Sequence, residues 1–241
     1  MTAFIGTSGW TYDHWAGRFY PEDLPTEQWL EYYADRFPAV EINNTFYQLP
    51  ADKTLDTWRD TVPRGFRFAV KASRYITHMK KLKDPRESIA RFFAKAERLG
   101  DRLGPILFQL PPNWHANPER LEAFIEALPD GHRYVFEFRD PDWWNETVAD
   151  ILAAHDCAFC PFDLAGQQSP VTVTTDFVYI RLHGPDGAYA GRYTDQALDQ
   201  WSERMRDWQT AGKSTWCFFD NDAEAQAAKD ARRLLDRLGN T

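Results

Sequence analysis

The sequence predicts an α/β fold, in the form of a single (β/α)8 TIM barrel. Short runs of β-branched and aromatic residues alternate with amphipathic helical stretches from one end of the chain to the other. Eight such runs share 241 residues, about 30 residues per unit, which is enough for a strand, a helix and two loops. No break in composition marks a second domain, so residues 1–241 are expected to form one domain. An open doubly wound sheet is the alternative architecture.

The eight strand candidates are rich in Val, Ile, Phe and Tyr, as buried parallel strands usually are. In chain order they are residues 3–8, 39–46, 67–73, 105–110, 133–139, 157–163, 177–183 and 214–220. The unit after the sixth strand is expected to be irregular, because residues 171–174 alternate like a strand where a helix should follow.

The helices between these strands carry recognisable start signals. Asn117 followed by Pro118 is typical of an N-cap and the first helical position, and Asp84 followed by Pro85 repeats the pattern. Gly100 is the expected stop of the second of these helices. The other predicted starts are about Glu27, after Trp143, after Thr194, and at Asn221 or Asp222.

Charge and cysteine content narrow the class of protein. The chain has 28 Lys and Arg against 36 Asp and Glu, a formal net charge of -8, which disfavours long nucleic acids and anionic membranes as partners. Its first residues lack both a basic segment and a long apolar stretch, and three cysteines cannot form a disulfide framework. We therefore expect a cytoplasmic protein with no membrane partner, and the oligomeric state stays open.

Polar residues end nearly every predicted strand, and in a barrel the ligand site lies at the carboxyl ends of the strands. Side chains two positions apart in a strand point to the same face. Three pairs are therefore expected to converge inside the barrel. These pairs are Glu41 with Asn43, Glu137 with Arg139, and Arg181 with His183.

Buried charges of this kind must be paired, because an unpaired ion in a low-dielectric interior costs several kcal/mol or more. Three acids and three bases balance one another here: Glu41, Glu137 and Asp163 against Lys71, Arg139 and Arg181. The functional interpretation is a ligand site. The structural alternative is a network that only closes the end of the barrel.

Three chemistries fit these residues, and the first is the capture of a small anion combined with acid–base catalysis of hydrolase or lyase type. In it, Glu41 or Glu137 is the base, Arg139 and Arg181 hold the anion, His183 carries a proton and Asn43 orients the substrate. The remaining candidate ligand-binding residues are Ser8, Trp10, Tyr12, Lys71, Gln109, Asp163 and Asn221.

The second chemistry is glycoside hydrolysis by Glu41 and Glu137, with aromatic platforms for the sugar: Trp10, Tyr12, Trp143 and Trp144. The third is a divalent-metal enzyme, such as a sugar isomerase or a phosphodiesterase-like enzyme. It would use Mg or Mn held by Glu137, Asp163, His183 and Asp220. No cofactor is expected for the first chemistry.

Other segments suggest further possibilities. Residues 74–83 (RYITHMKKLK) form either a solvated loop or a basic rim, and the rim would suit a non-catalytic module that binds nucleic acid or a modified nucleotide. Residues 184–191 (GPDGAYAG) are a candidate lid. Cys157 and Cys160 are not expected to form a disulfide, because residues i and i+3 of a strand point to opposite faces.

Several motifs together resemble the YecE-like family, also called domain of unknown function 72. They include Gly6–Trp10 (GTSGW), the segment 41–47 (EINNTFY), the segment 136–139 (FEFR), and Arg181 with His183 and Gly184. The resemblance spans essentially the whole chain and implies a TIM-barrel fold, but it brings no established reaction.

Overall fold

The computed structural model describes residues 3–239, which form a mixed α/β fold with parallel sheets. The strands are β1 (Ala3–Thr7), β2 (Ala39–Ile42), β3 (Arg67–Lys71), β4 (Leu103–Leu110), β5 (Tyr134–Phe138), β6 (Ala158–Phe159), β7 (Phe162–Leu164), β8 (Gln167–Gln168), β9 (Phe177–Leu182) and β10 (Ser214–Phe219). The α-helices are α1 (Trp29–Ala34), α2 (Asn44–Tyr47), α3 (Asp52–Thr61), α4 (Pro85–Ala96), α5 (Pro118–Ile125), α6 (Glu146–Ala154), α7 (Asp195–Thr210) and α8 (Gln226–Leu238). A π-helical turn, η3 (Tyr75–Met79), and short 3₁₀ turns complete the secondary structure: η1 (Asp13–Trp15), η2 (Thr26–Gln28), η4 (Glu97–Arg102), η5 (Pro141–Trp143) and η6 (Ala223–Ala225).

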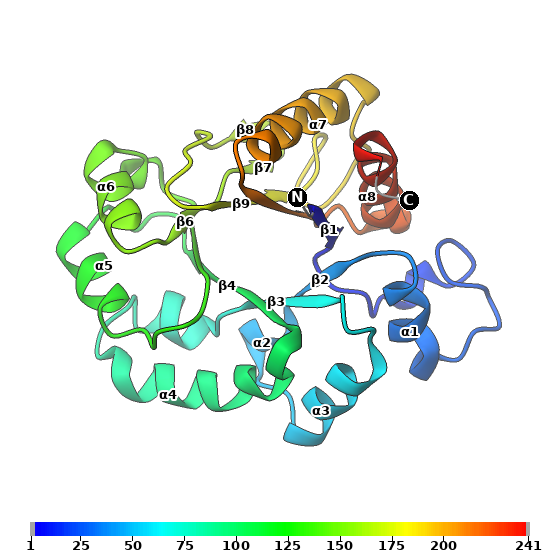
Figure 1. Ribbon diagram of the computed structural model, residues 1–241, viewed down its shortest axis with the longest axis horizontal. Helices are drawn as coiled ribbons and strands as arrows, with labels where there is room; N and C mark the ends of the chain where they lie inside the picture. Colours follow the sequence, from blue (N-terminus) through cyan, green and yellow to red (C-terminus); the bar gives the residue numbers. More distant parts are fainter. Residues whose placement is uncertain (1–2, 240–241) are drawn as a thin grey trace.

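The strands form two five-stranded sheets, in the orders β1-β10-β9-β7-β8 and β2-β3-β4-β5-β6. Every strand pair is parallel except β7 with β8. The two sheets meet at an isolated parallel bridge between Ser8 and Glu41, and the chain also passes directly from β6 in one sheet to β7 in the other. Figure 1 shows the strands gathered around a common centre, with most helices on the outside.

Each of the eight predicted strands overlaps an observed one, with two internal differences. The prediction for residues 43–46 was wrong, because β2 ends at Ile42 and α2 follows. The Thr45 hydroxyl donates to the carbonyl of Lys71 at 2.6 Å, which fastens this turn to the end of β3. The sixth strand is divided into β6 and β7 around Cys160 and Pro161, and proline has no N–H for the ladder.

The irregular sixth unit is confirmed. After β7 the chain turns into the short antiparallel β8, and the structure has no helix between residues 165 and 176. Side chains hold this segment in place instead: Ser169 Oγ accepts from the Phe162 amide at 2.8 Å, and Thr174 Oγ1 accepts from the Phe159 amide at 2.9 Å. Loop 169–176 therefore covers this part of the sheet where a helix would normally lie.

The helix starts follow the sequence signals in part. Asn117 Oδ1 accepts from the Arg120 amide at 2.9 Å, and Thr194 Oγ1 accepts from the Ala197 amide at 3.1 Å, as N-caps do. The predicted cap of the last helix at Asn221 or Asp222 was wrong, because η6 intervenes and α8 begins at Gln226. Helix α3 was not predicted.

Two apolar clusters separate the inside of the strands from their outside. The inner cluster consists of strand and strand-end residues: Ala39, Ala69, Leu107, Val135, Ala158, Cys160, Phe177, Tyr179, Trp216 and Phe218. The larger cluster joins the other strand faces to the helices. The period of two therefore places Glu41, Glu137 and Arg181 directly beyond the inner cluster, two residues after Ala39, Val135 and Tyr179. Within residues 3–239, no helix is both long and apolar enough to cross a bilayer.

Candidate functional site

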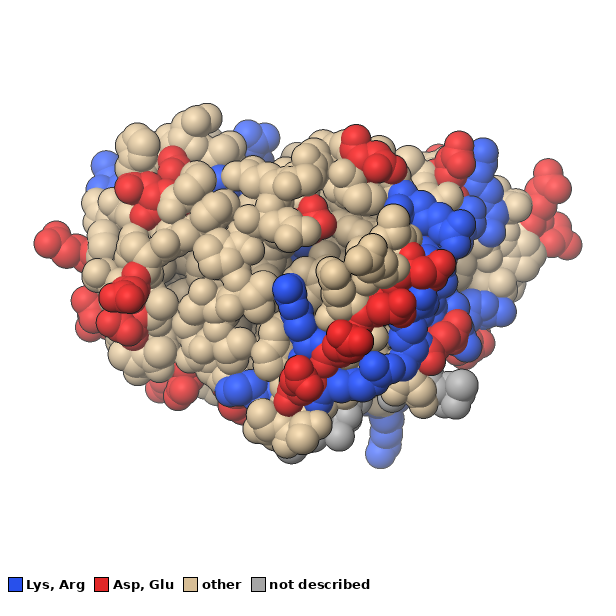
Figure 2. All heavy atoms as spheres, turned by 90° about the horizontal axis from the view of Figure 1, so that it is seen from above, with Lys and Arg blue, Asp and Glu red and all other residues tan. Residues whose placement is uncertain are grey.

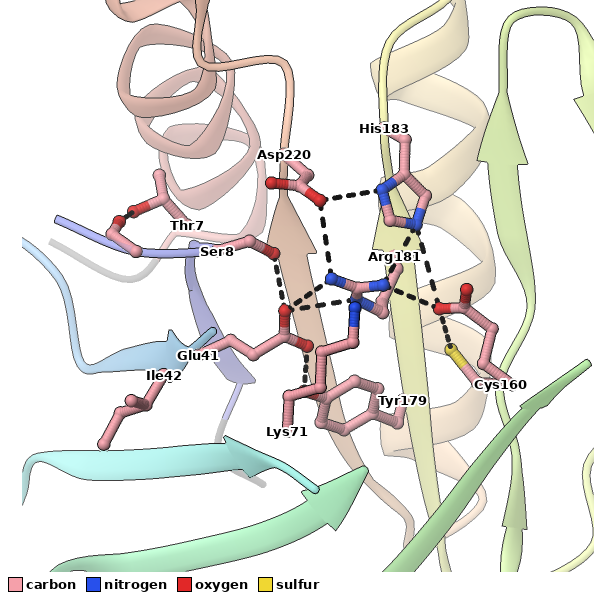
Figure 3. Close-up of polar contacts among 12 residues, drawn as sticks. Thr7, Ser8, Glu41, Ile42, Lys71, Cys160, Tyr179, Arg181, His183 and Asp220 are labelled. Atoms are coloured by element: carbon pink, nitrogen blue, oxygen red, sulfur yellow. Dashed lines mark hydrogen bonds and ion pairs between the residues drawn. The ribbon is translucent and has the colours of Figure 1, made fainter. Parts of the chain in front are cut away.

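A cluster of buried charged side chains lies at the carboxyl ends of the strands, with Arg181 at its centre (Figure 3). We refer to Glu41, Glu137, Arg139, Arg181, His183 and Asp220 as the charged cluster. Arg181 Nη2 donates to Glu41 Oε1 at 2.7 Å and Nη1 donates to Glu137 Oε2 at 2.9 Å. Neither carboxylate has any exposed surface, and Arg181 is 1% exposed. The predicted convergence of the three strand pairs is therefore observed for their charged members.

The guanidinium of Arg181 has no free donor for a ligand. Besides its bonds to the two glutamates, it contacts His183 Nε2 at 3.3 Å and Asp220 Oδ2 at 3.4 Å. Burial alone would lower the pKa of Arg181, but the charges of Glu41, Glu137 and Asp220 raise it well above its usual value. Arg181 therefore stays charged and joins three carboxylates, and the anion-holding role predicted for it is not what this geometry favours.

The carboxylates of Glu41 and Glu137, like the guanidinium of Arg181, are taken up by hydrogen bonds within the protein. Glu41 also accepts from Ser8 Oγ at 2.7 Å and from the hydroxyl of Tyr179 at 2.5 Å. Glu137 accepts from Arg139 Nε in addition to Arg181. Burial by itself would raise the pKa of Glu137, yet the charges of Arg139 and Arg181 hold it well below the usual range. A buried carboxylate kept ionised in this way is a poor proton acceptor at neutral pH.

The hydrogen bonds of His183 assign its tautomer. Arg139 Nη2 lies 2.7 Å from Nε2, and a guanidinium can only donate, so Nε2 is the accepting, unprotonated nitrogen. Nδ1 therefore carries the proton and donates it to Asp220 Oδ2 at 2.9 Å. Burial would raise the pKa of Asp220, but its hydrogen bond from His183 and the nearby charges keep that pKa below the usual value.

Lys71 differs from the arginines because it has no ion pair and no side-chain hydrogen bond within residues 3–239. Its Nζ lies 4.3 Å from the centre of the Phe46 ring. Burial lowers the pKa of Lys71 to about 8, and the charge of Arg181 adds to the effect, against the opposing pull of Glu137, Glu41 and Asp220. Figure 3 shows the side chain reaching toward Arg181.

Three side chains that follow the ends of β5, β3 and β2 also bear on ligand binding, namely Arg139, His78 and Asn43. Arg139 uses Nε and Nη2 inside the cluster, but its Nη1 has no partner in the described part of the chain, and its guanidinium lies 4.5 Å from the Phe162 ring centre. His78 packs edge-on against Phe46, and burial followed by the charges of Lys71, Arg74 and Arg139 lowers its pKa to about 4. Asn43 Oδ1 is buried without a hydrogen-bond partner.

We call Lys71, His78 and Arg139 the rim group. After burial, the charges of Lys71 and Arg139 help to lower the pKa of His78, so its imidazole is neutral at pH 7 beside two cations. Two donors, Lys71 Nζ and Arg139 Nη1, remain without an acceptor in the part of the chain that the structure describes. This arrangement has free capacity for an anion, whereas Arg181 has none.

The other predicted site residues lie apart from the charged cluster or serve the fold. Trp10 is a correction: it is 3% exposed and packs on Trp58 and Phe68, so it is not a platform for a ligand. Trp143 is likewise buried, against Phe138. Tyr12 is half-buried and donates its hydroxyl to the Ser8 carbonyl at 2.5 Å.

Three more of these residues have local structural partners. Gln109 donates to the carbonyl of Leu110 at 2.8 Å. Asn221 donates to Gly191 O and to Asp230 Oδ2, and so fixes the start of the last helical segment to the loop before α7. Asp163 accepts from Gln168 in the β7–β8 hairpin, and burial raises its pKa.

Sequence reasoning missed several members of the site. Tyr179 was not singled out, although it lies two residues before Arg181 on the same inward face of β9. Phe46 and His78 were missed as neighbours of Lys71, because α2 and η3 were expected to be strand and loop. Because side chains two positions apart in a strand share a face, Tyr179 could have been assigned to the face of Arg181 from the sequence.

The donor set proposed for a metal is not assembled. Among residues 3–239, no group of three or more His, Cys, Asp and Glu side chains is arranged to hold a metal ion. Arg181 lies among Glu137, His183 and Asp220 and takes up their lone pairs. The positive charge of Arg181 opposes a cation at that position.

The basic run, residues 74–83, and the candidate lid, residues 184–191, both have defined structures. In the basic run, Ile76 and Thr77 are buried in η3, while Tyr75 and Met79 are exposed. In loop 184–191, the Tyr189 amide donates to the His183 carbonyl at 2.7 Å and its ring lies 5.9 Å from the imidazole. On the face that contains α7, basic and acidic side chains are interspersed (Figure 2), and pairs such as Arg237 with Asp199 join α8 to α7.

Comparison with known proteins identifies relatives over the whole described chain. A family model described as "Protein of unknown function DUF72" matches residues 4–241. The chain is 25% identical over 269 residues to the UPF0759 protein YunF of Bacillus subtilis (strain 168), covering 98% of this chain and 94% of that protein.

Solved structures show the same fold. A DUF72 family protein from Thermotoga maritima MSB8 superposes with a TM-score of 0.90 at 30% identity, covering 99% of this chain and 100% of that one. A DUF72 family protein from Enterococcus faecalis V583 gives 0.85 at 18% identity, covering 100% and 96%. A D-psicose 3-epimerase from Clostridium cellulolyticum H10 gives 0.55 at 12% identity, covering 99% and 98%, which is a likeness of fold alone.

Proposed function

Because the chain belongs to the DUF72 family of proteins of unknown function, we propose its activity from the site itself: it is an enzyme of hydrolase or lyase type that acts on a small anionic metabolite. The ligand lies at the carboxyl ends of the strands, on the rim group. The other members of the charged cluster, Glu41, Glu137, Arg181, His183 and Asp220, support the rim group. The observation that supports this proposal most strongly is that Lys71 Nζ and Arg139 Nη1 have no acceptor in the described part of the chain. Every other charge of the cluster is paired.

We also propose that the two sheets close into a (β/α)8 barrel. The bridge between Ser8 and Glu41 and the direct passage from β6 to β7 support closing the two sheets into one ring. The likeness to the epimerase fold is consistent with this arrangement. We also propose that the protein works in the cytoplasm, since Cys157, Cys160 and Cys217 are all free and buried.

The roles within the site differ from those that the sequence suggested. Arg139 Nη1 holds the anion, because that guanidinium is anchored by Glu137 on one side and stacked on Phe162 on the other. Lys71 moves the proton, because a lysine with a pKa of about 8 can both accept and donate a proton near neutral pH. Glu41, Glu137 and His183 position these two groups, and Asn43 offers an acceptor to the substrate.

The test measures ligand-induced stabilisation. Thermal unfolding of the wild type is followed in increasing phosphate, sulfate and acetate at constant ionic strength, alongside Lys71→Met, Arg139→Lys and the control Lys53→Met, an exposed lysine of α3. An anion at 100 times its Kd should stabilise the wild type and the control by about 2.7 kcal/mol. Both rim variants should lose most of that increment. Equal increments in all four proteins would contradict the proposal.

A further inference from the structure

A reactive amine needs to be partly neutral, accessible from the ligand side and free of hydrogen-bond partners. Lys71 meets the geometric part of this description. It points inward from the end of β3, is only partly exposed, and makes no ion pair within residues 3–239. The face of the Phe46 ring lies 4.3 Å from Nζ and attracts the ammonium form, so it is burial and the charge of Arg181 that favour the neutral amine.

A hydrogen bond from the neighbouring Thr45 holds Phe46 in position. Thr45 is 3% exposed and its hydroxyl reaches the carbonyl of Lys71 at 2.6 Å, so α2 is tied to the residue whose amine Phe46 covers. Arg181 favours the neutral amine, because it is permanently charged and lies behind Lys71. An ordinary surface lysine has neither of these restraints.

We propose that Lys71 is a covalent nucleophile that forms a Schiff base with the carbonyl group of the substrate. This inference rests on the proposed function, and it narrows the substrate to a small molecule that carries both an aldehyde or ketone and an anionic group. Arg139 Nη1 binds the anionic group and presents the carbonyl carbon to Nζ of Lys71. The two free donors of the rim group thus receive two different parts of one molecule.

The step balances without an oxidant or a reductant. The ammonium of Lys71 first loses a proton to solvent, and the lone pair of the amine forms the C–N bond while the carbonyl π electrons move to oxygen. Two protons, one from nitrogen and one from solvent, convert that oxygen to water, which leaves as the C=N bond of a protonated imine forms. The net change is ammonium plus carbonyl giving iminium plus water, so charge is conserved.

The amount of neutral amine supports this step. A lysine with a pKa of about 8 has roughly 230 times more neutral amine at pH 7 than one with an ordinary pKa near 10.4. Part of this gain is lost, because a weaker base is also a weaker nucleophile. We therefore expect at least a tenfold preference for Lys71 over exposed lysines at pH 7.

The experiment traps the imine by reduction. Full-length protein is incubated at pH 7 with sodium cyanoborohydride and one of three probes: pyruvate, dihydroxyacetone phosphate or acetone. The modified lysine is then located by peptide mass spectrometry. The carboxylate and phosphate arms distinguish the two kinds of anionic group, and acetone supplies the carbonyl without an anion. Lys71→Arg keeps the charge but cannot form the imine, and Lys53→Arg is the matched control.

The expected result is an adduct on Lys71 that is at least tenfold enriched over Lys53, is stronger with an anionic probe than with acetone, and is absent in Lys71→Arg. Half-maximal labelling of Lys71 should fall near pH 8. Labelling spread over exposed lysines, or no adduct with any probe, would overturn the proposal. Anion-induced stabilisation measured on the same samples separates the outcomes: stabilisation without an adduct rejects the Schiff base alone, and the absence of both rejects the proposed function as well.

Discussion

His183 and Arg139 share one hydrogen bond in which the arginine donates to Nε2, and this bond commits the imidazole to a single tautomer. The proton on Nδ1 is donated to Asp220, so both ring nitrogens are occupied and the side chain has no exposed surface. A histidine held in this way orients its neighbours. This arrangement favours an orienting role over proton transfer for His183, and the proposed function therefore assigns proton transfer to Lys71.

Glu137→Gln tests how much the charged cluster contributes to the fold. The amide keeps the shape of the side chain, but it leaves Arg139 without a carboxylate and removes one of the three carboxylates around Arg181. Breaking a buried pair costs about 3–5 kcal/mol. We expect the free energy of unfolding, measured with urea, to fall by that amount. Glu122→Gln, on the exposed surface of α5, should change it by less than about 0.5 kcal/mol. A loss below about 1 kcal/mol in Glu137→Gln would show that the pairs are not integral to the fold.

The pH dependence of the same contribution has a defined sign. The pKa values of Glu137 and Asp220 are lower in the folded protein than in the unfolded chain. Their stabilisation is therefore present above the unfolded value, near pH 4, and is lost as the pH falls through their folded pKa values. The difference between wild type and Glu137→Gln should accordingly shrink below pH 4, as measured by urea unfolding at a series of pH values.

Lys71→Met is expected to stabilise the protein at neutral pH. The folded pKa of about 8 lies below the unfolded value, so the charged lysine is disfavoured in the folded state by at most roughly 3 kcal/mol. Between about pH 8 and 10.4 the unfolded chain binds more protons at this lysine than the folded protein does. The free energy of unfolding of the wild type therefore rises relative to that of the variant as the pH increases. Urea unfolding at pH 7 and pH 10 measures both values. A variant less stable than the wild type at pH 7 would show that the lysine serves the fold.

The imidazole of His78 reports directly on occupancy of the rim group. Burial and the charges of Lys71, Arg74 and Arg139 lower its pKa to about 4. An anion bound between Lys71 and Arg139 would offset those positive charges, so saturating phosphate should raise this pKa by about 1 unit. Proton–nitrogen NMR titration of the histidine rings follows the change, with exposed His115 as an internal control. An unchanged titration of His78 would place the anion elsewhere.

The sequence predicted the inward row of charges because a strand repeats every two residues. Glu41, Glu137 and Arg181 could be assigned to one face from spacing alone, and the structure brings them within hydrogen-bond distance. The opposite fates of Arg181 and Lys71 could not be predicted in this way. They depend on how far each side chain reaches and on which partner it meets, and therefore on non-local contacts such as the one between Arg181 and Asp220.

The surroundings of Lys71 could not be predicted from the sequence, because they depend on a local conformation that a distant contact sets. Residues 43–46 have strand-like composition, but α2 forms there because Thr45 bonds to the end of β3, a contact between segments 26 residues apart. That turn brings Phe46 over Lys71. Trp10 shows the converse error, since an aromatic residue beside a predicted site proved to be core.

A crystal soaked with tungstate would show where the anion binds, because the anomalous signal of tungsten locates it without prior assumptions. We expect a peak within hydrogen-bond distance of both Lys71 Nζ and Arg139 Nη1, with Arg181 still bonded to Glu41 and Glu137. We also expect Arg139→Lys to abolish this peak. Tungstate bound only elsewhere on the protein, or a peak that replaces the glutamates around Arg181, would rule out anion binding at the rim group.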